Sequence, residues 1–580
     1  MTFTADRVLL SGNEAIAHGA LEAGVGFATG YPGTPSSEIL EALAEITSAP
    51  VEWAPNEKVA LESAIGASLA GTRALVTMKH VGLNVAADPL FTAAYTGVNA
   101  GLVIVTADDP GMYSSQNEQD NRHYAFAAKI PLLEPSDSQE ALLFARRAFH
   151  LSEQFDIPVL LRTTTRLSHT KCVVTAHPPQ SPPPSPGLAD DPQKYVMIPA
   201  HAHDRHISLL QRIIRLEAIS NGDEFNHVQL GDFRLGIITS GVSYQYAKEV
   251  APNASFLKIG MPFPFPVELV RKFAAIVQRL VVFEELDRIL ELQVRALGLQ
   301  CDSKPDSMLV GELSPDSAAQ VILGAQPQPS PTLSIPSRPP ILCAGCPHRN
   351  VFFLLNKLNA YVAGDIGCYT LSVLPPLQAM QTCLCMGAGI GQAHGLSQVY
   401  AGDRPIVAVI GDSTFVHSGI TGLINMAYNQ STATVIILDN RTTAMTGGQS
   451  HPATGRNLRG QPAPELDLAA LCRALGVNRV TVIDPYDLAQ LEATLAQETS
   501  ANELSVIIAR HPCVLLAGKT SGTLEFDPEV CPGCGLCLQL GCPALVQSGD
   551  EEGRPDILLA TCSACGACVQ ICPFQALRIT

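Results

Sequence analysis

Eight cysteines near the end of the chain stand in two regularly spaced sets, and this spacing predicts iron–sulfur chemistry. In each set, three cysteines at two-residue gaps are followed by a fourth cysteine and a proline: Cys531, Cys534, Cys537 and Cys542, then Cys562, Cys565, Cys568 and Cys572. Where two such runs hold two [4Fe–4S] clusters, the fourth cysteine of each run ligates the other cluster. We therefore expect Cys572 to complete the cluster of the first set and Cys542 that of the second.

Four thiolates also suit tetrahedral zinc, so a pair of zinc sites is the alternative interpretation. Zinc ribbons use paired Cys-x-x-Cys units and lack the Cys-Pro ending, which favours clusters here. The first run has four residues before Cys542 where the usual bacterial spacing has three. We expect this extra residue to lengthen one loop without removing a ligand.

Composition and length set the broad class of the protein. The chain has 580 residues, of which 46% are hydrophobic and only 16% charged, and this predicts several well-buried domains. Its net charge of −17 makes nucleic acid a poor partner. We find no signal-peptide pattern and no apolar stretch of the roughly 18 residues that a membrane helix needs. We therefore expect a cytoplasmic protein whose 17 cysteines are metal ligands or reduced thiols.

Proline-rich segments divide the chain into parts. Residues 177–192 and 326–340 are expected to be extended linkers, and a softer joint falls at 518–522. The predicted parts are 1–176, a linker and extension at 177–229, 230–325, a linker at 326–340, 341–520, and a cysteine-rich domain at 521–580.

Short apolar runs alternate with amphipathic segments through the three long parts. The expected strands cover 74–78, 102–106, 159–162, 235–239, 280–283, 406–410 and 434–438. A helix is expected after Ser136 and Gln139, which match a capping box ahead of an apolar repeat. Such alternation predicts an α/β fold in which helices cover parallel sheets. The cysteine-rich tail is too short for a large core and should depend on its clusters.

In the third long part, two side chains that can bind a metal follow neighbouring strands. Gly411-Asp412-Ser413 ends one expected strand, a helix is expected from about 418 to 430, and Asn440 follows the next strand. Open α/β sheets bind ligands at the carboxyl ends of their strands. Asp412, Asn440 and the main-chain carbonyl of Thr442 offer hard oxygen ligands for Mg²⁺, which keeps phosphates and water in its shell.

This segment resembles the thiamine diphosphate motif, in which a GDG sequence is followed by NN. Here the matching residues are GDS and DN, so two of five positions depart from the general form, in the manner of 2-oxoacid:ferredoxin oxidoreductases. The resemblance implies that Asp412, Asn440 and Thr442 hold Mg²⁺, and that Gly411 and Ser413 adjoin the cofactor. The alternative is an ordinary βαβ unit with an Asp-Ser turn.

Further stretches are expected to face the same cofactor. In CAGCPHR, Cys346, His348 and Arg349 are candidates, because Arg matches phosphate geometry. Cys343 and Cys346 are alternatively a zinc or redox pair. Two small-residue turns would let the backbone approach a bulky ligand, although the second is equally common in helix packing. These turns supply Gly364, Asp365, Gly367, Cys368, Met386 and Gly387.

The first part is expected to complete the site. Thiamine enzymes use a glutamate to hydrogen-bond the aminopyrimidine ring, and the resemblance gives this role to Glu57, between a short strand and a helix. The alternative is an acid that favours the helix dipole. In GYPGTPSSE, which matches a family loop, Thr34 is expected to hold the substrate carboxylate. Arg122 is a second candidate for the carboxylate, or else a surface salt-bridge residue.

The order of these motifs resembles the large (alpha) subunits of indolepyruvate:ferredoxin oxidoreductases, within the 2-oxoacid:ferredoxin oxidoreductase family. The motifs, spread over essentially the whole chain, are YPGTPSSE, Glu57, TADDPGMYSSQNEQD, CAGCPHR, GDSTFVHSGI, DNRTTAMTGGQ and the two cysteine runs. The resemblance implies three thiamine-enzyme-like α/β domains followed by a two-cluster ferredoxin-like α+β domain. The α/β domains would be pyrimidine-binding-like at 1–176, transketolase-C-like at 230–325 and thiamine diphosphate/Mg²⁺-binding at 341–520.

The resemblance also implies an activity and partners. The activity is oxidative decarboxylation of aryl pyruvates to aryl-acetyl-CoA, with CoA as co-substrate and electrons passing through two [4Fe–4S] clusters to ferredoxin. The partners are a smaller beta subunit in a hetero-oligomer and ferredoxin, with no nucleic acid and no membrane. The alternatives are another 2-oxoacid substrate, a non-oxidative thiamine-dependent decarboxylase, or a scaffold subunit that kept an inactive thiamine fold.

Overall fold

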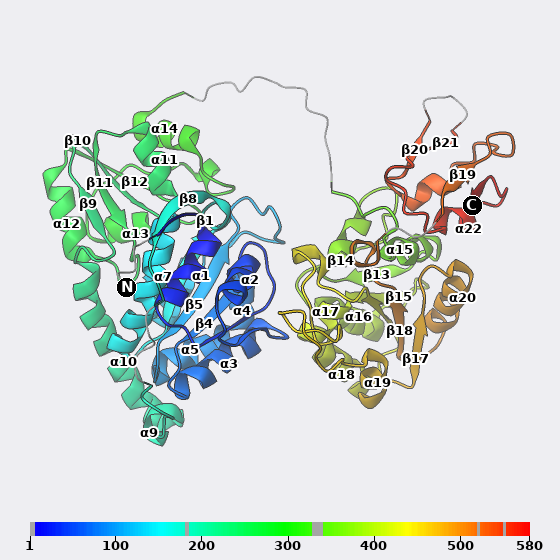
Figure 1. Cartoon of the computed structure of the whole chain (residues 1–580), viewed down its shortest axis with the longest axis horizontal. Helices are drawn as coiled ribbons and strands as arrows, with labels where there is room; N and C mark the ends of the chain where they lie inside the picture. The colour runs from blue at the N-terminus through cyan, green and yellow to red at the C-terminus, as the bar shows by residue number, and fades with distance from the viewer. Residues whose placement is uncertain (1–5, 180–184, 327–339, 519–521, 549–552) are drawn as a thin grey trace. The chain divides into compact units, whose positions relative to one another are not determined.

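The computed structural model describes residues 6–179, 185–326, 340–518, 522–548 and 553–580. The chain divides into two compact units, Met1–Thr332 and Leu333–Thr580, each with hydrophobic cores of its own (Figure 1). Residues 180–184 of the first expected linker, 327–339 of the second and 519–521 of the softer joint lie outside the described residues. The division into six parts remains a proposal.

A six-stranded parallel sheet forms the centre of the first unit. Its strands lie in the order β3 (Val51–Trp53), β2 (Phe27–Gly30), β4 (Ala74–Lys79), β5 (Leu102–Asp108), β7 (Val159–Thr164) and β6 (Leu132–Leu133). The three longest strands are buried along their whole length, as expected for parallel strands covered on both faces. An antiparallel pair, β1 (Asp6–Ser11) and β8 (Lys171–Ala176), accompanies the sheet.

Helices connect these strands and cover the sheet. They are α1 (Gly12–Glu22), α2 (Ser37–Ile46), α3 (Glu57–Leu69), α4 (His80–Val85), α5 (Ala87–Thr96), α6 (Arg122–Ala128), α7 (Ser138–Phe155) and α8 (Thr165–His169). The expected helix is α7, but its cap differs from the prediction. Asp137, not Ser136, is the N-cap and accepts a hydrogen bond from Glu140 N at 2.9 Å. Gln139 accepts instead from Thr175 N, which removes it from the predicted capping box.

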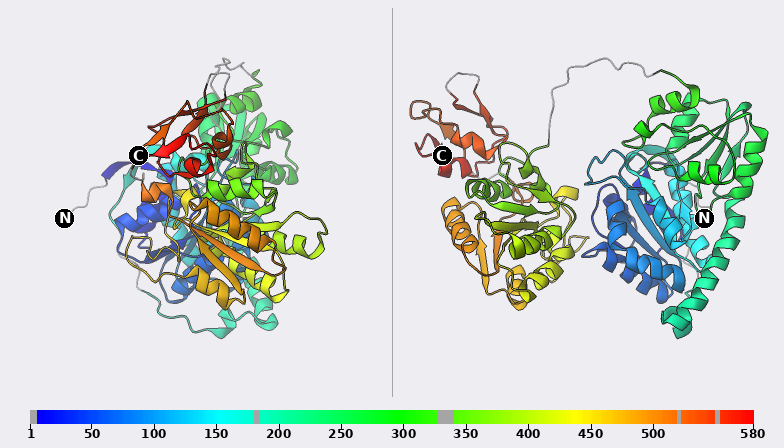
Figure 2. Two further views of the ribbon diagram at one scale, coloured as in Figure 1. Left: turned by 90° about the vertical axis from the view of Figure 1, so that its right-hand side faces the viewer. Right: turned by 180° about the vertical axis from the view of Figure 1, so that it is seen from behind.

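The rest of the first unit contains a second sheet and a long helix. The sheet order is β12 (Arg279–Phe283), β10 (Asp232–Ser240), β11 (Ala254–Ile259) and β9 (His227–Gln229), with β9 antiparallel to its neighbour. Its helices are α11 (Ser243–Val250), α12 (Val267–Ile276), α13 (Ile289–Ala296) and α14 (Pro315–Leu323). The part expected to be a linker and extension contains α9 (Pro192–Tyr195) and α10 (Pro199–Ser220), and Figure 2 shows α10 along the side of this unit.

The second unit is built on another six-stranded parallel sheet. The order is β14 (Thr382–Cys383), β13 (Tyr361–Gly364), β15 (Ile406–Gly411), β16 (Thr434–Asp439), β18 (Ser505–Arg510) and β17 (Arg479–Ile483). Its helices are α15 (His348–Lys357), α16 (Ala388–Val399), α17 (Asp412–Thr414), α18 (Ile420–Tyr428), α19 (Leu468–Ala474), α20 (Leu488–Thr499) and α21 (Val514–Ala517). These two large sheets confirm the predicted parallel α/β fold class.

The helix after β15 starts earlier than predicted. Instead of beginning near residue 418, helical backbone begins directly at Asp412, and a π-helical turn at Phe415–Gly419 joins α17 to α18. Single π turns inside helices occur frequently at functional sites. The helix therefore starts at the candidate metal ligand itself.

The cysteine-rich tail is a small α+β domain within the second unit (Figure 1). Its elements are the antiparallel pairs β19 (Leu524–Phe526) with β22 (Leu577–Ile579) and β20 (Leu545–Gln547) with β21 (Pro555–Ile557), and the helix α22 (Ala567–Ile571). Its apolar cluster is small and includes cysteines among its members. This agrees with a fold that depends on groups bound to those cysteines.

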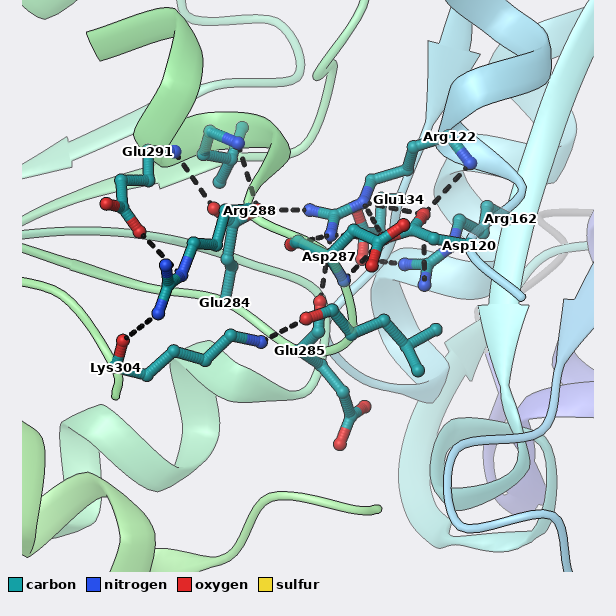
Figure 3. Close-up of polar contacts among 12 residues, drawn as sticks. Asp120, Arg122, Glu134, Arg162, Glu284, Glu285, Asp287, Arg288, Glu291 and Lys304 are labelled. Carbon is teal, nitrogen blue, oxygen red and sulfur yellow. Dashed lines mark hydrogen bonds and ion pairs between the residues drawn. The ribbon is translucent and has the colours of Figure 1, made fainter. Parts of the chain in front are cut away.

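Buried ion pairs join the two sheets of the first unit. The Arg122 side chain is fully buried; its Nη1 donates to Glu284 Oε2 at 2.7 Å and its Nε to Asp120 Oδ1 at 3.0 Å (Figure 3). Arg162, also fully buried, donates to Asp108 Oδ2 at 2.7 Å and pairs with Glu134. Arg122 therefore connects the β5–α6 loop to the end of β12.

Burial and neighbouring charge together set the protonation of this network. Burial works to raise the pKa of Asp120, but Arg122 and Arg162 hold that pKa well below its ordinary range. Burial raises the pKa of Asp108 and raises that of Glu285 to about 7. Both arginines therefore favour the charged form of Asp120 inside the protein.

Replacing Arg122 with methionine should destabilise the first unit by ~3–5 kcal/mol, because Asp120 and Glu284 lose a buried cation. Urea unfolding followed by the fluorescence of Trp53 measures this, since the single tryptophan lies in β3 of that unit. Arg234→Met is the matched control, because it removes an exposed pair with Asp232 and should leave the midpoint almost unchanged. Equal shifts in the two variants would contradict a structural role for the buried network.

Candidate cofactor and electron-transfer site

Asp412 and Asn440 lie together at the carboxyl edge of the second unit's sheet. Their strands, β15 and β16, are parallel neighbours, and both side chains are buried. Asp412 Oδ1 accepts a hydrogen bond from Ser413 N, and Asp412 Oδ2 accepts one from Arg441 N, each at 2.8 Å. The carboxylate thus bridges the two loops whose residues are the predicted Mg²⁺ ligands.

A histidine that the sequence analysis missed completes this edge. His451 Nε2 lies 3.2 Å from Asp412 Oδ2, and both side chains are almost fully buried. The contact arises because the chain folds back after Thr443, whose N donates to Gln449 O at 2.9 Å. Nothing in the local spacing of His451 marks it, since only this fold-back brings it to Asp412.

Asn440 is oriented by His348, the first residue of α15. Asn440 Nδ2 lies 3.2 Å from His348 Nε2, and burial lowers the pKa of His348 to about 4. A neutral imidazole can accept through Nε2, so Asn440 can donate its amide N–H there and direct its oxygen elsewhere. His348 therefore orients Asn440, and its predicted contact with the diphosphate remains a proposal.

The donor set at this edge fits Mg²⁺ and a diphosphate. Among the residues that the structure describes, no Lys or Arg side chain forms an ion pair with Asp412, so a divalent cation would supply a missing positive charge. Arg441, between Asn440 and Thr442, has a φ of +65°, which is uncommon outside glycine and frequent at functional sites. That turn brings Thr442 back toward Asn440, whose Oδ1 accepts from Thr442 N at 3.2 Å.

Asp365 supports the glycine turn beside the candidate metal edge. Its Oδ1 accepts from Gly387 N and its Oδ2 from Gly389 N, each at 3.0 Å, and burial raises its pKa to about 6. Gly387 has a φ of +86°, and an added Cβ would lie 2.6 Å from Ser418 Cβ. Asp365 thus holds the turn that begins α16.

The residues around Asp365 belong to the same supporting layer. Gly364 packs against Met380, Gly367 precedes a 3₁₀ turn that begins at Cys368, and Met386 is half-buried. Tyr369 OH accepts from Gly411 N at 2.8 Å, which ties this turn to the Asp412 loop.

Arg349 differs most from its expected role in this unit. Its Nη1 donates to the carbonyls of Leu540 and Gly541, and its Nη2 to those of Leu342 and Cys343, at distances of 2.5 to 3.1 Å. The side chain is buried, and these carbonyls hold both of its terminal nitrogens inside the protein. We correct the prediction: Arg349 joins the cofactor domain to the cysteine-rich tail.

The two predicted cysteine sets line two separate cavities in the tail. One cavity is lined by Cys531, Cys534, Cys537 and Cys572, and the other by Cys542, Cys562, Cys565 and Cys568. The fourth cysteine of each run therefore lies with the other run, which is the arrangement that two [4Fe–4S] clusters need. Burial raises the pKa of Cys568 to about 12, so binding iron there would have to displace a proton.

A third group of cysteines, which the sequence analysis did not recognise as a group, adjoins the edge that carries Asn440 and the cavity lined by Cys542. Burial raises the pKa of Cys346 to about 12 and that of Cys368 to about 11, and neighbouring thiols add to both shifts. For Cys346 those thiols are Cys368 and Cys343, and for Cys368 they are Cys513 and Cys343. Cys513 N donates to Asn440 O at 2.9 Å. The Cys343-x-x-Cys346 spacing was visible in the sequence, but Cys368 and Cys513, which lie near this pair in the structure, are distant from it in sequence.

In the first unit, Glu57 and Thr34 lie at the carboxyl edge of the sheet. Glu57 begins α3, is buried, and packs against Gly82, where an added Cβ would lie 2.5 Å from Glu57 Oε1. Thr34 lies in the loop between β2 and α2, and its carbonyl accepts from Ser114 Oγ at 3.5 Å. The structure therefore brings Glu57 and the Thr34 loop to one edge.

Arg122 lies elsewhere than expected. Full burial and its pairs with Asp120 and Glu284 exclude the surface salt bridge, and they commit its donors to the protein. We correct both predictions for Arg122: it lies at the internal joint of the first unit, where its fully buried side chain is held by Asp120 and Glu284.

Comparisons with known proteins agree with this geometry. Residues 365–509 match the C-terminal TPP-binding domain of thiamine pyrophosphate enzymes, and residues 18–205 match the thiamine diphosphate-binding domain of pyruvate flavodoxin/ferredoxin oxidoreductases. Residues 523–573 match a 4Fe-4S dicluster domain. Indolepyruvate oxidoreductase subunit IorA of Methanothermobacter thermautotrophicus is 41% identical, over 99% of this chain and 97% of that protein. The chain belongs to the IorA family.

IorA of Archaeoglobus fulgidus is 40% identical over 99% of this chain and 97% of that protein. As a member of this family, the chain is an oxidoreductase with thiamine diphosphate-binding domains and a [4Fe–4S] domain. A solved 2-oxoglutarate:ferredoxin oxidoreductase from Magnetococcus marinus is 16% identical with a TM-score of 0.45, over 55% of this chain and 65% of that chain. None of the helices described for this IorA-family chain is long and apolar enough to cross a membrane.

The cavity assignment predicts an exchange of ligands between the cysteine runs. Cys542→Ala should disturb the cluster of Cys562, Cys565 and Cys568, so its reduced electron paramagnetic resonance spectrum should match that of Cys568→Ala. Cys172→Ala, in β8 of the first unit, is the control and should leave the spectrum unchanged. A Cys542→Ala spectrum that matches Cys537→Ala instead would show that the ligands are not exchanged.

Proposed function

We propose that this chain catalyses the thiamine diphosphate-dependent oxidative decarboxylation of aryl pyruvates to aryl-acetyl-CoA and passes the electrons to ferredoxin. One observation carries the proposal: α15 and the turn before it adjoin both the metal edge and a four-cysteine cavity. His348 contacts Asn440, and Cys346 and Arg349 line the cavity of Cys542. His348, at the cofactor-binding edge, therefore lies directly before Arg349 and two positions after Cys346, both of which line a candidate cluster site.

The roles at the cofactor follow from the donors that each unit presents. Asp412, Asn440 and the Thr442 carbonyl would hold Mg²⁺ and through it the diphosphate, while His348 and Asp365 fix the surrounding loops. Bound thiamine diphosphate supplies the electron sink for loss of carbon dioxide. Glu57 would hold a proton at the aminopyrimidine ring, for which its burial beside Gly82 is suited.

The assigned partners follow from the same activity. Clusters of low reduction potential need an electron acceptor of similarly low potential. Ferredoxin would take the electrons from the cysteine-rich tail. A smaller beta subunit would complete a hetero-oligomer, as the names of the relatives as subunits suggest. A reducing, cytoplasmic setting is part of the proposal, because thiolate ligands must stay reduced.

We extend the proposal to a third iron–sulfur cluster, held by Cys343, Cys346, Cys368 and Cys513. Support comes from position, since Cys346 lines the tail cavity and Cys513 N donates to Asn440 O, and from the neighbouring thiols that help to raise the pKa values of Cys346 and Cys368. Anaerobically purified protein should then hold about twelve iron atoms per chain, against about eight from the tail alone. Cys368→Ser should lower the content by about four iron atoms. Equal iron in both proteins would contradict the third cluster.

The substrate and the fate of the electrons have alternatives that one assay separates. A relative named 2-oxoglutarate synthase subunit KorA, from Methanothermobacter marburgensis, is 26% identical over 48% of this chain, so another 2-oxoacid is the second candidate. The assay mixes the purified complex with CoA, a viologen dye and a panel of 2-oxoacids. Dye reduction fastest with indolepyruvate supports the proposal. Release of aldehyde with the dye and clusters unreduced would favour a non-oxidative decarboxylase.

Glu57→Gln should slow cluster reduction by indolepyruvate by ~10²–10⁴-fold, because proton transfer by a positioned group is lost. Stopped-flow absorbance of the clusters measures this rate, and dithionite should still reduce them. Thiamine diphosphate binding by calorimetry should remain in Glu57→Gln but fail in Asp412→Ala, which lacks the charged metal ligand. Wild-type reduction rates in Glu57→Gln would leave Glu57 as a helix-start acid only.

A further inference from the structure

An ammonium group is buried at the sheet edge that carries Thr34 and Glu57. Lys79 is the last residue of β4 and is only 8% exposed. Its Nζ donates to Ser114 O at 2.7 Å and to Ser114 Oγ at 3.3 Å, and both of these partners are neutral. Lysine is almost never buried in this way unless it is paired or has a function.

The neighbours of Lys79 are the loops that the proposed function assigns to substrate and cofactor. A Cβ added to Gly33 would lie 3.0 Å from Lys79 Cβ, so the Thr34 loop crosses directly over the lysine stem. Ser114, which accepts from Lys79, also donates to Thr34 O. Three residues after Lys79, Gly82 lies against the Glu57 carboxylate.

The charges around Lys79 leave its own charge without a direct partner. No carboxylate among the described residues forms an ion pair with it, and the charged or titratable groups that face it are Asp109 and His80. The Asp109 oxygens accept from Ser114 N, Ser115 Oγ and Thr165 Oγ1 instead. Burial works to raise the Asp109 pKa, but these hydrogen bonds hold it below its ordinary value, so Asp109 stays charged at a distance.

Lys258 is a buried lysine of the same unit that does have a carboxylate partner, and it serves as a comparison for Lys79. It is equally buried, in β11 of the same unit, and it forms a direct ion pair with Glu140. Burial lowers the pKa of both lysines to about 8. Lys79 therefore carries the cost of burial without the ion pair that accompanies Lys258, and an anionic ligand would supply the missing partner.

We propose that Lys79 binds the carboxylate of the 2-oxoacid substrate, beside Thr34 and Glu57. The proposal rests on the function proposed above, which requires an anionic substrate, and it gives Lys79 the role first expected of Arg122. Arg122 is paired with Asp120 and Glu284, whereas the Lys79 ammonium, which donates to Ser114 O and Ser114 Oγ, has a third N–H to donate. Lysine makes one contact with a carboxylate, whereas arginine can make two. A single contact suits a carboxylate that leaves as carbon dioxide, because strong binding of the intact carboxylate stabilises the substrate more than the transition state.

Two unreactive analogues test the contact in the holoenzyme. Indole-3-propionate carries the carboxylate, and indole-3-propionamide is its neutral counterpart. Calorimetry should show that wild type prefers the acid by roughly 10- to 100-fold, the worth of a charge-assisted hydrogen bond. Lys79→Met should lose this preference, and Lys79→Arg should keep part of it. Lys58→Met, which changes an exposed lysine on α3, is the control and should behave as wild type.

The pH dependence gives a readout that a merely structural lysine would not produce. Below its pKa of about 8 Lys79 is charged, so the preference of wild type for the acid should be constant there and fall as pH rises through that value. In Lys79→Arg the preference should persist to higher pH, because the guanidinium stays protonated. In Lys79→Met no pH dependence of the preference should remain.

The outcomes separate this proposal from the proposed function. If wild type reduces its clusters with indolepyruvate but Lys79→Met still prefers the acid, the role of Lys79 is overturned and the function stands. If wild type binds neither analogue and its clusters stay oxidised with every 2-oxoacid, both are overturned. Thiamine diphosphate binding in Lys79→Met should equal that of wild type, which shows that the variant is folded.

Discussion

Parallel strand pairing is the constraint on which the candidate substrate and cofactor sites of both α/β units depend. A parallel sheet places all carboxyl ends of its strands along one edge, and the loops there must supply the ligands. In the first unit this edge holds the Thr34 loop after β2, Lys79 at the end of β4 and Asp109 after β5. In the second unit the same edge holds Asp412 after β15 and Asn440 after β16.

Buried charges decide which residues remain available at those edges. A buried cation must be paired or hydrogen-bonded, and a side chain that the protein holds in this way is not free to turn toward a ligand. Arg122 meets Asp120 and Glu284 inside the first unit, and Arg349 meets four backbone carbonyls inside the second. Lys79 and Asp412, by contrast, are buried charges whose direct partners are neutral groups or a histidine.

Sequence alone predicted the features that depend on local spacing. The strand ends at Gly411 and Asp439 follow from apolar runs that stop at polar residues, so the neighbouring positions of Asp412 and Asn440 could be anticipated. The pairing of Cys542 with the later cysteine run follows from the same kind of rule. The N-cap of α7 was misplaced by one residue, because Ser136 and Asp137 are both good caps and only backbone geometry separates them.

Features that depend on distant partners could not be predicted. His451 matters because the chain folds back at Gln449, and Cys513 because its backbone meets Asn440. Arg122 and Arg349 were assigned to ligands because a guanidinium group matches carboxylates and phosphates. The same group can also bind acceptors that belong to the protein, and local sequence does not separate the two cases. Their actual partners, Glu284 and the Leu540 carbonyl, lie more than a hundred residues away in sequence.

The placement of Arg349 explains how one short segment serves two cofactors. His348 and Arg349 begin α15, so their backbone positions are fixed relative to each other by the helix. His348 contacts Asn440, while Arg349 binds the carbonyls just before Cys542. Gly541, at a φ of +64°, packs so closely that an added Cβ would lie 2.7 Å from Pro376 Cδ. The start of α15 therefore holds the edge that carries Asn440 on one side and the loop before Cys542 on the other, so the helix fixes the separation between these two candidate sites.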